Sequence, residues 1–238
     1  MTDASAMNLL YPQVKICGLT LPHEAAHCAT LGADAIGVVF FPKSPRHVTA
    51  DQARAVVAVL PETAAAVGVF VNASFSTIMA RVERCGLCMA QLHGRESPDL
   101  AARLKAEGVG VIKALFVDGR PGLSDAPDFN VDGYLVECAK GPLPGGNAAA
   151  WNWRTARDFG RRHPLVLAGG LSPENVAAAI DAALPAAIDV SSGVEALPGR
   201  KDMDRVARLI AAVQYTADPY TAKRIAPVFG SKKGRPHA

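Results

Sequence analysis

Short runs of β-branched and apolar residues alternate with segments of helical spacing along most of this 238-residue chain. The alternation continues from residue 14 to about residue 214 and includes eight candidate strands. Strands that alternate with helices are typical of βα units on a parallel sheet. Eight such units in about 200 residues predict a single (β/α)8 barrel, or TIM barrel, with a parallel eight-stranded core.

The candidate strands are Val14–Cys17, Ala35–Phe40, Ala66–Val71, Met89–Leu92, Gly110–Ala114, Gly133–Glu137, Leu165–Ala168 and Ala187–Val190. The candidate helices are Pro22–Leu31, Ala50–Leu60, Ser74–Cys85, Ser97–Glu107, Asn152–Arg162, Pro173–Ala183 and Met203–Val213. Residues 116–132, rich in Gly, Pro and Asp, predict a degenerate unit without a clear helix after the fifth strand. A doubly wound sheet is the alternative architecture, but no GxGxxG motif follows the first strand.

Composition divides the chain into three parts. We expect residues 1–12 to form an N-terminal extension without the features of a signal peptide, and residues 13–214 to form the barrel. Residues 215–238 carry five Lys and Arg side chains against one Asp, and we expect a basic, flexible tail. The folded part has no basic surface interleaved with aromatics and no apolar run of about 18 residues, so we expect neither a nucleic-acid nor a membrane partner.

The five cysteines are too few and too scattered for a disulfide-stapled secreted domain, and they predict a protein of the reducing cytoplasm. Cys85 and Cys88 have CxxC spacing, but no second pair completes a zinc site. We therefore expect no metal. The sequence does not decide between a monomer and a homodimer.

Cys17 ends the first candidate strand, at the end of a barrel strand where the active site of this fold lies. Side chains alternate along a strand, so Lys15 shares a face with Cys17, and a cation beside a thiol favours the thiolate. The alternative is that Cys17 is a small buried apolar residue, as free cysteines usually are. Lys15 could equally pair with a carboxylate for structural reasons.

Polar side chains and glycines follow several other strands. Gly169-Gly170 and Ser192-Gly193 follow the seventh and eighth strands, where phosphate sites recur in these barrels, although Gly also serves tight turns. Arg46 lies in a loop stiffened by two prolines, where a guanidinium can bind a carboxylate through two hydrogen bonds. His93 is interpreted as a residue that lines the pocket and not as a base.

Together these motifs resemble the phosphoribosylanthranilate isomerase family, a group of (β/α)8 barrels of tryptophan biosynthesis. The likeness spans about residues 13–214 and rests on VKICGLT at 14–20, GVVFFPKSPRHVT at 37–49, VGVFVN at 67–72, QLHG at 91–94, LAGGLSPENV at 167–176, DVSSGVE at 189–195 and PGRKD at 198–202. The resemblance implies an Amadori rearrangement of N-(5-phosphoribosyl)anthranilate by general acid and base catalysis, with a phosphorylated small molecule as substrate and no cofactor.

The resemblance also implies roles for single residues. The general base is Cys17, and the carboxylate anchor is Arg46. The substrate pocket includes Gln91, His93 and Asp189, and the phosphate site includes Gly169, Gly170, Ser192 and Gly193. The family's general acid is an aspartate that ends the sixth strand, where this chain has Glu137. The loop after that strand also departs from the family's pattern, because it lacks a Thr-Gly pair.

A glutamic acid can make the same proton transfer, because the intrinsic pKa values of the two carboxyls are similar and Glu is one methylene longer. Two alternatives stay open. The first is an isomerase of another phosphorylated aminoaldose, and the second is a non-catalytic protein that binds sugar phosphates.

Overall fold

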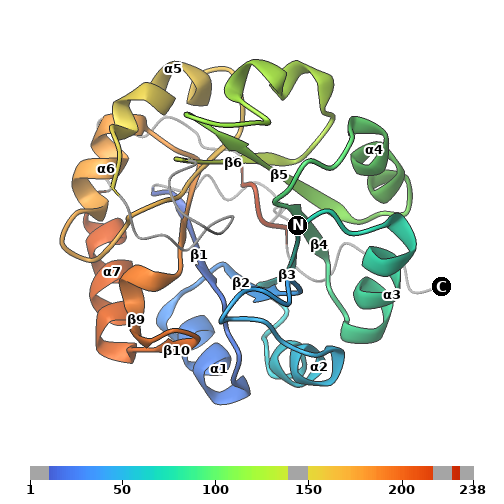
Figure 1. Cartoon of the computed structure of the whole chain (residues 1–238). Helices are drawn as coiled ribbons and strands as arrows, with labels where there is room; N and C mark the ends of the chain where they lie inside the picture. The colour runs from blue at the N-terminus through green and yellow to red at the C-terminus, as the bar shows by residue number, and fades with distance from the viewer. Residues whose placement is uncertain (1–10, 139–149, 217–226, 231–238) are drawn as a thin grey trace, which may run out of the picture.

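Eight parallel strands close into a barrel in this computed structural model, which describes residues 11–138, 150–216 and 227–230. Figure 1 looks along the barrel and shows the helices as an outer ring around the strands. The strands are β1 (Gln13–Cys17), β2 (Ala35–Val39), β3 (Ala65–Phe70), β4 (Met89–Leu92), β5 (Gly110–Phe116), β6 (Gly133–Glu137), β7 (Leu165–Leu167) and β8 (Ala187–Val190). The predicted fold class is confirmed.

The outer ring consists of α1 (Pro22–Leu31), α2 (Ala50–Ala58), α3 (Phe75–Cys85), α4 (Pro98–Ala106), α5 (Arg157–Gly160), α6 (Val176–Ala183) and α7 (Met203–Tyr215). Three 3-10 helices complete it: η1 (Leu123–Asp128), η2 (Trp153–Ala156) and η3 (Ser192–Val194). As predicted, the segment after β5 forms no α-helix, and η1 takes its place. The altered loop after β6 falls mostly in residues 139–149, outside the described residues.

Two predicted helices are shorter than expected. The segment predicted as Asn152–Arg162 divides into η2 and the single turn of α5. The helix predicted to begin at Pro173 begins at Val176, because the Asn175 side chain organises the preceding turn. Its Oδ1 accepts a hydrogen bond from the Ser172 N–H at 2.8 Å, and its Nδ2 donates to the Gly170 carbonyl at 2.9 Å.

The alternating strand side chains divide the core into layers. Outward-facing residues of the strands, such as Ile16 and Val38, pack with the helices in the largest apolar cluster. Inward-facing residues, such as Val67 and Leu135, form a smaller cluster inside the barrel. Cys17, Val39 and Val69 form a third cluster nearer to the C-terminal ends of the strands. The residues of this third layer line the candidate site.

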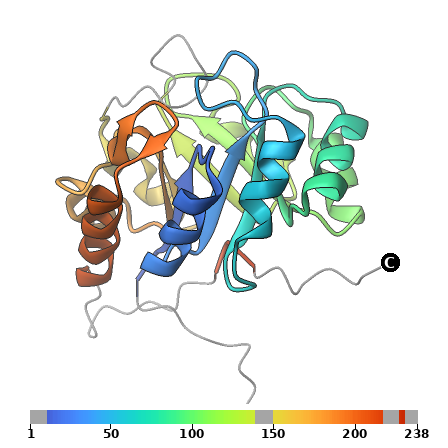
Figure 2. The same ribbon diagram turned by 90° about the horizontal axis from the view of Figure 1, so that it is seen from below.

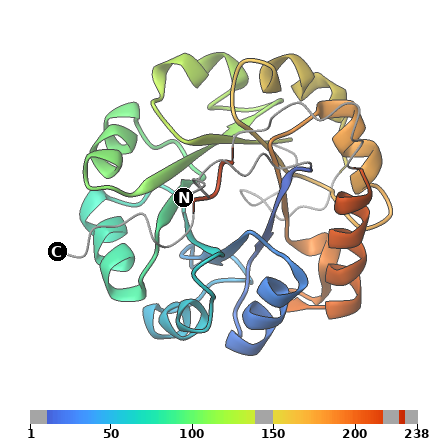
Figure 3. The same cartoon turned by 180° about the vertical axis from the view of Figure 1, so that it is seen from behind.

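Two residues of the C-terminal tail close the opposite end of the barrel. Val228 and Phe229 are 5% and 4% exposed and belong to the inner apolar cluster. The Gln13 side chain accepts hydrogen bonds from both of their N–H groups, at 2.7 and 2.8 Å, and donates to the Phe229 carbonyl at 3.0 Å. Figures 2 and 3 show this short red segment at the N-terminal ends of the strands. At these two positions the tail packs against the barrel, and residues 217–226 and 231–238 lie outside the described residues.

We predict that Phe229→Ala lowers the free energy of unfolding by about 3 kcal/mol, because it removes a buried aromatic ring from the barrel interior. Urea denaturation followed by circular dichroism measures the change. The matched control is Tyr215→Ala, which truncates an aromatic side chain that is 93% exposed and should change stability by less than about 0.5 kcal/mol. Equal stability of the two variants would show that the docked tail adds nothing to the fold.

Candidate active site

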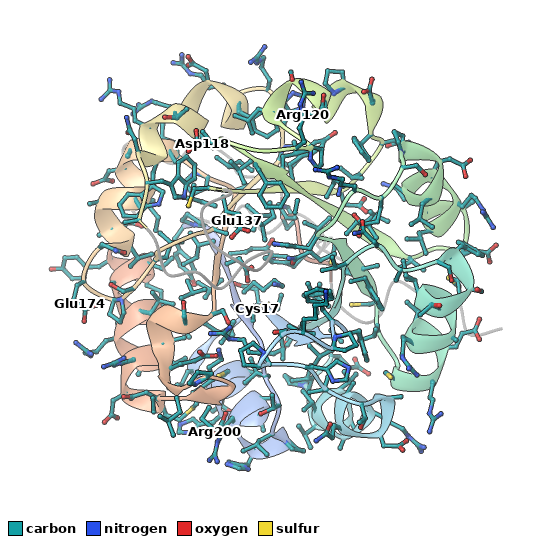
Figure 4. All side chains as sticks on the ribbon, in the orientation of Figure 1. Cys17, Asp118, Arg120, Glu137, Glu174 and Arg200 are labelled. Atoms are coloured by element: carbon teal, nitrogen blue, oxygen red, sulfur yellow. The ribbon has the colours of Figure 1, made fainter. Side chains whose placement is uncertain are left out.

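One cavity at the C-terminal ends of the strands contains all ten predicted site residues. Its lining includes Cys17, Arg46, Gln91, His93, Glu137, Gly169, Gly170, Asp189, Ser192 and Gly193. Figure 4 shows Cys17 and Glu137 within the ring of strands, whereas Asp118, Arg120, Glu174 and Arg200 lie toward its outside. The parallel arrangement explains this convergence, because every strand of the barrel ends at the same face.

Lys15 joins the first strand to the last beneath this cavity. Its fully buried ammonium group lies 2.8 Å from Asp189 Oδ1, and the two residues are paired in the register of β1 and β8. Lys15 also interacts with the Cys17 side chain, two residues further along the same strand face. A β-carbon at Gly37 of β2 would lie 2.8 Å from the Cys17 sulfur and 3.1 Å from Lys15 Nζ. The absence of a side chain at Gly37 therefore leaves room for both groups.

The ion pair changes how Lys15 acts on the thiol. Burial alone would lower the pKa of Lys15, but Asp189 and Cys17 outweigh burial and raise it, so the lysine is cationic. Burial raises the pKa of the Cys17 thiol above its ordinary value, and Lys15 opposes this effect only in part. Because the Asp189 carboxylate offsets the charge of Lys15, the free thiol is mainly protonated at neutral pH.

Arg46 is held by a carboxylate of its own. Its Nε and Nη2 donate to the two Glu195 oxygens at 2.8 and 2.6 Å, and Lys201 Nζ lies 2.8 Å from Glu195 Oε1. Burial alone would raise the pKa of Glu195, but the hydrogen bond from Arg46 and the charge of Lys201 lower it. Glu195 is thus an anion between two cations, and the group carries a net charge of about +1.

Sequence reasoning assigned no role to Glu195, although this residue ends the quoted DVSSGVE motif. It begins a two-stranded hairpin, β9 (Glu195–Leu197) and β10 (Arg200–Lys201), that was also not predicted. The Gly199 N–H donates to Glu195 Oε1 at 3.2 Å inside this hairpin. An acidic residue two positions after a Ser-Gly turn was the one available signal.

Glu137 ends β6 and faces His93 at the end of β4. Glu137 Oε1 lies 3.0 Å from His93 Nε2, and His93 Nδ1 lies 2.8 Å from Gln91 Nε2. All three residues are buried, with exposures of 6%, 5% and 1% for Glu137, His93 and Gln91. The carboxyl group therefore belongs to a hydrogen-bonded row that lines the pocket.

The two glycine loops are fixed by their neighbours. Gly169 and Gly170 have φ angles of +88° and +69°, which favour glycine, and a β-carbon at Gly169 would lie 2.9 Å from Trp151 Nε1. A β-carbon at Gly193 would overlap the Leu171 carbonyl oxygen, so the loops after β7 and β8 pack directly on each other.

Both tryptophans of the chain hold the loop after β7. Trp151 donates its indole N–H to the Ala168 carbonyl at 2.9 Å, and Trp153 donates to the Gly169 carbonyl at 3.2 Å. Their hydrogen bonds fix two successive carbonyl groups of the loop.

The other cysteines form no disulfide among the described residues and lie outside the cavity lining. Cys85 and Cys88 bind separate carbonyl groups, those of Ala50 and Ala66, at 3.4 Å each. Within the described ranges, no cluster of three or more His, Cys, Asp and Glu side chains is suited to a metal ion. No helix in those ranges is both long and apolar enough to cross a membrane.

We predict that iodoacetamide alkylates Cys17 slowly at neutral pH, and that the rate rises about tenfold per pH unit until it levels off above pH 9. The reason is the raised pKa of this thiol, since only the thiolate reacts. Peptide mass spectrometry measures the rate, with Cys28 as an internal reference because its pKa is raised to about 12. A plateau below pH 8 would contradict the prediction.

Comparisons with known proteins identify one family. The family model described as N-(5'phosphoribosyl)anthranilate (PRA) isomerase matches residues 14–212. An N-(5'-phosphoribosyl)anthranilate isomerase of Desulfatibacillum aliphaticivorans is 54% identical over 213 residues, which are 90% of this chain and 98% of the relative.

Two solved structures share the fold over most of the chain. One is a phosphoribosyl anthranilate isomerase in complex with reduced 1-(o-carboxyphenylamino)-1-deoxyribulose 5-phosphate, with a TM-score of 0.75, 38% identity and coverage of 86% of this chain and 99% of that one. The other is of monomers derived from the dimeric enzyme of Thermotoga maritima, with a TM-score of 0.74, 36% identity and the same coverage. The chain belongs to the N-(5'-phosphoribosyl)anthranilate isomerase family.

Proposed function

We propose that this protein isomerises N-(5-phosphoribosyl)anthranilate to 1-(2-carboxyphenylamino)-1-deoxyribulose 5-phosphate in tryptophan biosynthesis, by an Amadori rearrangement. The observation that carries the proposal is the cavity itself. It presents a thiol on β1 and a carboxyl group on β6 beside two glycine loops of the phosphate-binding type. An aldose-to-ketose isomerisation needs such a pair, because one proton is given to oxygen and another is removed from carbon.

Glu137 acts as the general acid and Cys17 as the general base. Glu137 gives a proton to the ribose ring oxygen, and the bond from this oxygen to C1′ breaks as the anthranilate nitrogen forms an iminium. Cys17, which acts as the base once its thiol has ionised, then removes the proton from C2′, and the electron pair moves toward the nitrogen to give an enolamine. Tautomerisation of the enolamine gives the ketone. The reaction needs no cofactor, since the substrate's own nitrogen accepts the electrons.

The phosphate group binds at the glycine loops after β7 and β8. The N–H groups of Gly170 and Ser192 form no hydrogen bonds to other described residues, so they are available to phosphate oxygens. Trp151 and Trp153 support this arrangement, because they bind carbonyl groups that would otherwise repel an anion.

The anthranilate carboxylate binds to Arg46. Glu195 occupies the Nε and Nη2 edge of the guanidinium, which leaves its Nη1 and Nη2 edge for the substrate. Asp189 binds Lys15 through Oδ1, and its Oδ2 is available to a ribose hydroxyl group. Gln91 and His93 complete the pocket wall on the side of Glu137.

The two alternative functions are disfavoured by the same site. An aminoaldose with phosphate at both ends needs a second dianion site, but the Arg46 loop supplies one buried guanidinium already paired with Glu195, and its Lys43 is exposed. A binding protein without activity does not need the matched thiol and carboxyl group.

We expect a cytoplasmic protein that is a monomer or a homodimer. The described cysteines form no disulfides, which supports a cytoplasmic protein. The dimeric relative supports a homodimer. Sedimentation velocity measures the oligomeric state.

We predict that Cys17→Ala and Glu137→Gln each lower kcat for phosphoribosylanthranilate about 100- to 10,000-fold, because each removes one partner of acid and base catalysis. Steady-state assays, with complementation of a tryptophan auxotroph, test this prediction. Glu137→Asp should retain part of the activity, since it keeps a carboxyl group. The shorter side chain places this group one methylene further from the substrate. Turnover by Cys17→Ala at the rate of the parent protein would exclude the thiol as the base.

We predict that Arg46→Met lowers kcat/KM about 10- to 100-fold, mainly through KM, because it removes charged hydrogen bonds to the substrate carboxylate. Lys43→Met is the matched control, since it removes an exposed cation from the same loop. Equal kcat/KM values for the two variants would place the carboxylate elsewhere in the cavity.

A further inference from the structure

Gln91, His93 and Glu137 form a continuous row of hydrogen bonds along one wall of the cavity. The amide nitrogen of Gln91 contacts His93 Nδ1 at 2.8 Å, and His93 Nε2 contacts Glu137 Oε1 at 3.0 Å. The other end of the Gln91 side chain, Oε1, is buried and has no hydrogen-bond partner in the described part of the chain. The row is therefore directional, with the amide N–H as its first donor.

This direction determines where the proton of a neutral His93 ring resides. An amide nitrogen only donates, so Nδ1 must accept and carries no proton. The single ring proton is then on Nε2, where it points at Glu137 Oε1. If the amide were turned by half a rotation, Gln91 Oε1 would accept from Nδ1–H and the ring would have no proton to offer Glu137.

The backbone around His93 keeps the ring in place. The His93 N–H donates to the Phe70 carbonyl at 2.8 Å. Lys113 Nζ binds the carbonyls on both sides of His93, those of Leu92 at 3.0 Å and Gly94 at 2.7 Å. The ring of Phe116 meets the imidazole edge to face at 5.8 Å. The imidazole is thus held so that Nε2 faces β6.

From this geometry we propose that Gln91 and His93 are positioning residues for the acid. Gln91 holds His93 in the tautomer with the proton on Nε2, and this N–H stabilises the carboxylate that Glu137 becomes on giving up its proton. The inference rests on the proposed function, in which Glu137 is the general acid.

The step involves one proton. It leaves Glu137 Oε2, which has no partner among the described residues, and goes to the ribose ring oxygen as the bond from this oxygen to C1′ breaks. The electron pair of that bond goes to the oxygen. The negative charge left on Glu137 is shared with Oε1, which accepts the N–H of His93. No proton moves on the imidazole. A hydrogen bond to a charged acceptor is stronger than one to a neutral acceptor, so the contact strengthens as the reaction proceeds.

The decisive variant is Gln91→Glu, which has nearly the same shape but presents acceptors only when ionised. It should draw a proton to His93 Nδ1. We expect kcat to fall about 10- to 100-fold, which corresponds to the free energy of one charge-assisted hydrogen bond, and KM to change little. Gln91→Met is the matched control. It has similar length and fixes neither tautomer, so its kcat should lie between those of the parent protein and Gln91→Glu.

A spectroscopic measurement separates this role from a structural one. Long-range 1H–15N NMR spectra report which imidazole nitrogen carries the proton, and His93→Gln assigns the His93 signals by their loss. We expect the proton on Nε2 in the parent protein and on Nδ1 in Gln91→Glu. His93→Gln keeps an N–H donor and should retain more kcat than His93→Leu, which has none.

A proton on Nδ1 in the parent protein would overturn the inference. So would a normal kcat for Gln91→Glu with its proton moved to Nδ1, or equal kcat values for His93→Gln and His93→Leu. Glu137→Gln distinguishes this failure from that of the proposed function. If Glu137→Gln is inactive while Gln91→Glu is normal, only the positioning role is wrong. If Glu137→Gln turns over normally, the acid assignment fails and the inference fails with it.

Discussion

The ion pair between Lys15 and Asp189 connects the first strand of the barrel to the last, and the geometry of the site depends on it. The two residues are opposite each other in the register of β1 and β8, and Lys15 is fully buried. Removing one partner of a buried pair leaves an uncompensated charge, which strongly destabilises a protein. A shift of one residue between these strands would turn Lys15 out of the barrel, and Cys17 would turn with it. The pair thus fixes the direction in which the thiol points.

The charges of the cavity are grouped by side. Lys15, Arg46 and Lys201 lie on the side of β1, β2 and β8, together with the anions Asp189 and Glu195. On the side of β6, Glu137 is joined to the uncharged Gln91 amide through His93. A substrate that carries a phosphate and a carboxylate is attracted to the cationic side. On the other side, no Lys or Arg of the described cavity lining contacts the Glu137 carboxyl group.

Much of this arrangement could be predicted because it depends on local patterns. Strand periodicity placed the ends of all eight strands to within two residues, and the glycines at 169 and 193 marked loops in which a β-carbon would collide. Contacts between residues distant in sequence were not predictable. The partnership of Arg46 with Glu195 spans 149 residues, and that of Gln13 with Phe229 spans 216. The basic composition of the tail did not indicate that two of its apolar residues would pack inside the barrel at the N-terminal ends of the strands. The turn at Asn175 was missed for a related reason, since a side chain that bonds the backbone can replace the first turn of a helix.

The resemblance leads us to expect an aspartate where this chain has Glu137, and the longer side chain is best understood from the row of side chains beside it. An additional methylene moves a carboxyl group about 1.5 Å further from its strand and adds a rotatable bond. The contact between Glu137 Oε1 and His93 Nε2 removes part of this freedom, because it fixes one oxygen against a ring that Phe70, Lys113 and Phe116 hold in place. The longer acid is therefore as well oriented as its anchoring histidine, and its free oxygen faces the cavity. Orientation, more than side-chain length, decides whether a carboxyl group can give a proton to a bound sugar, since catalysis depends on the geometry of the reacting atoms.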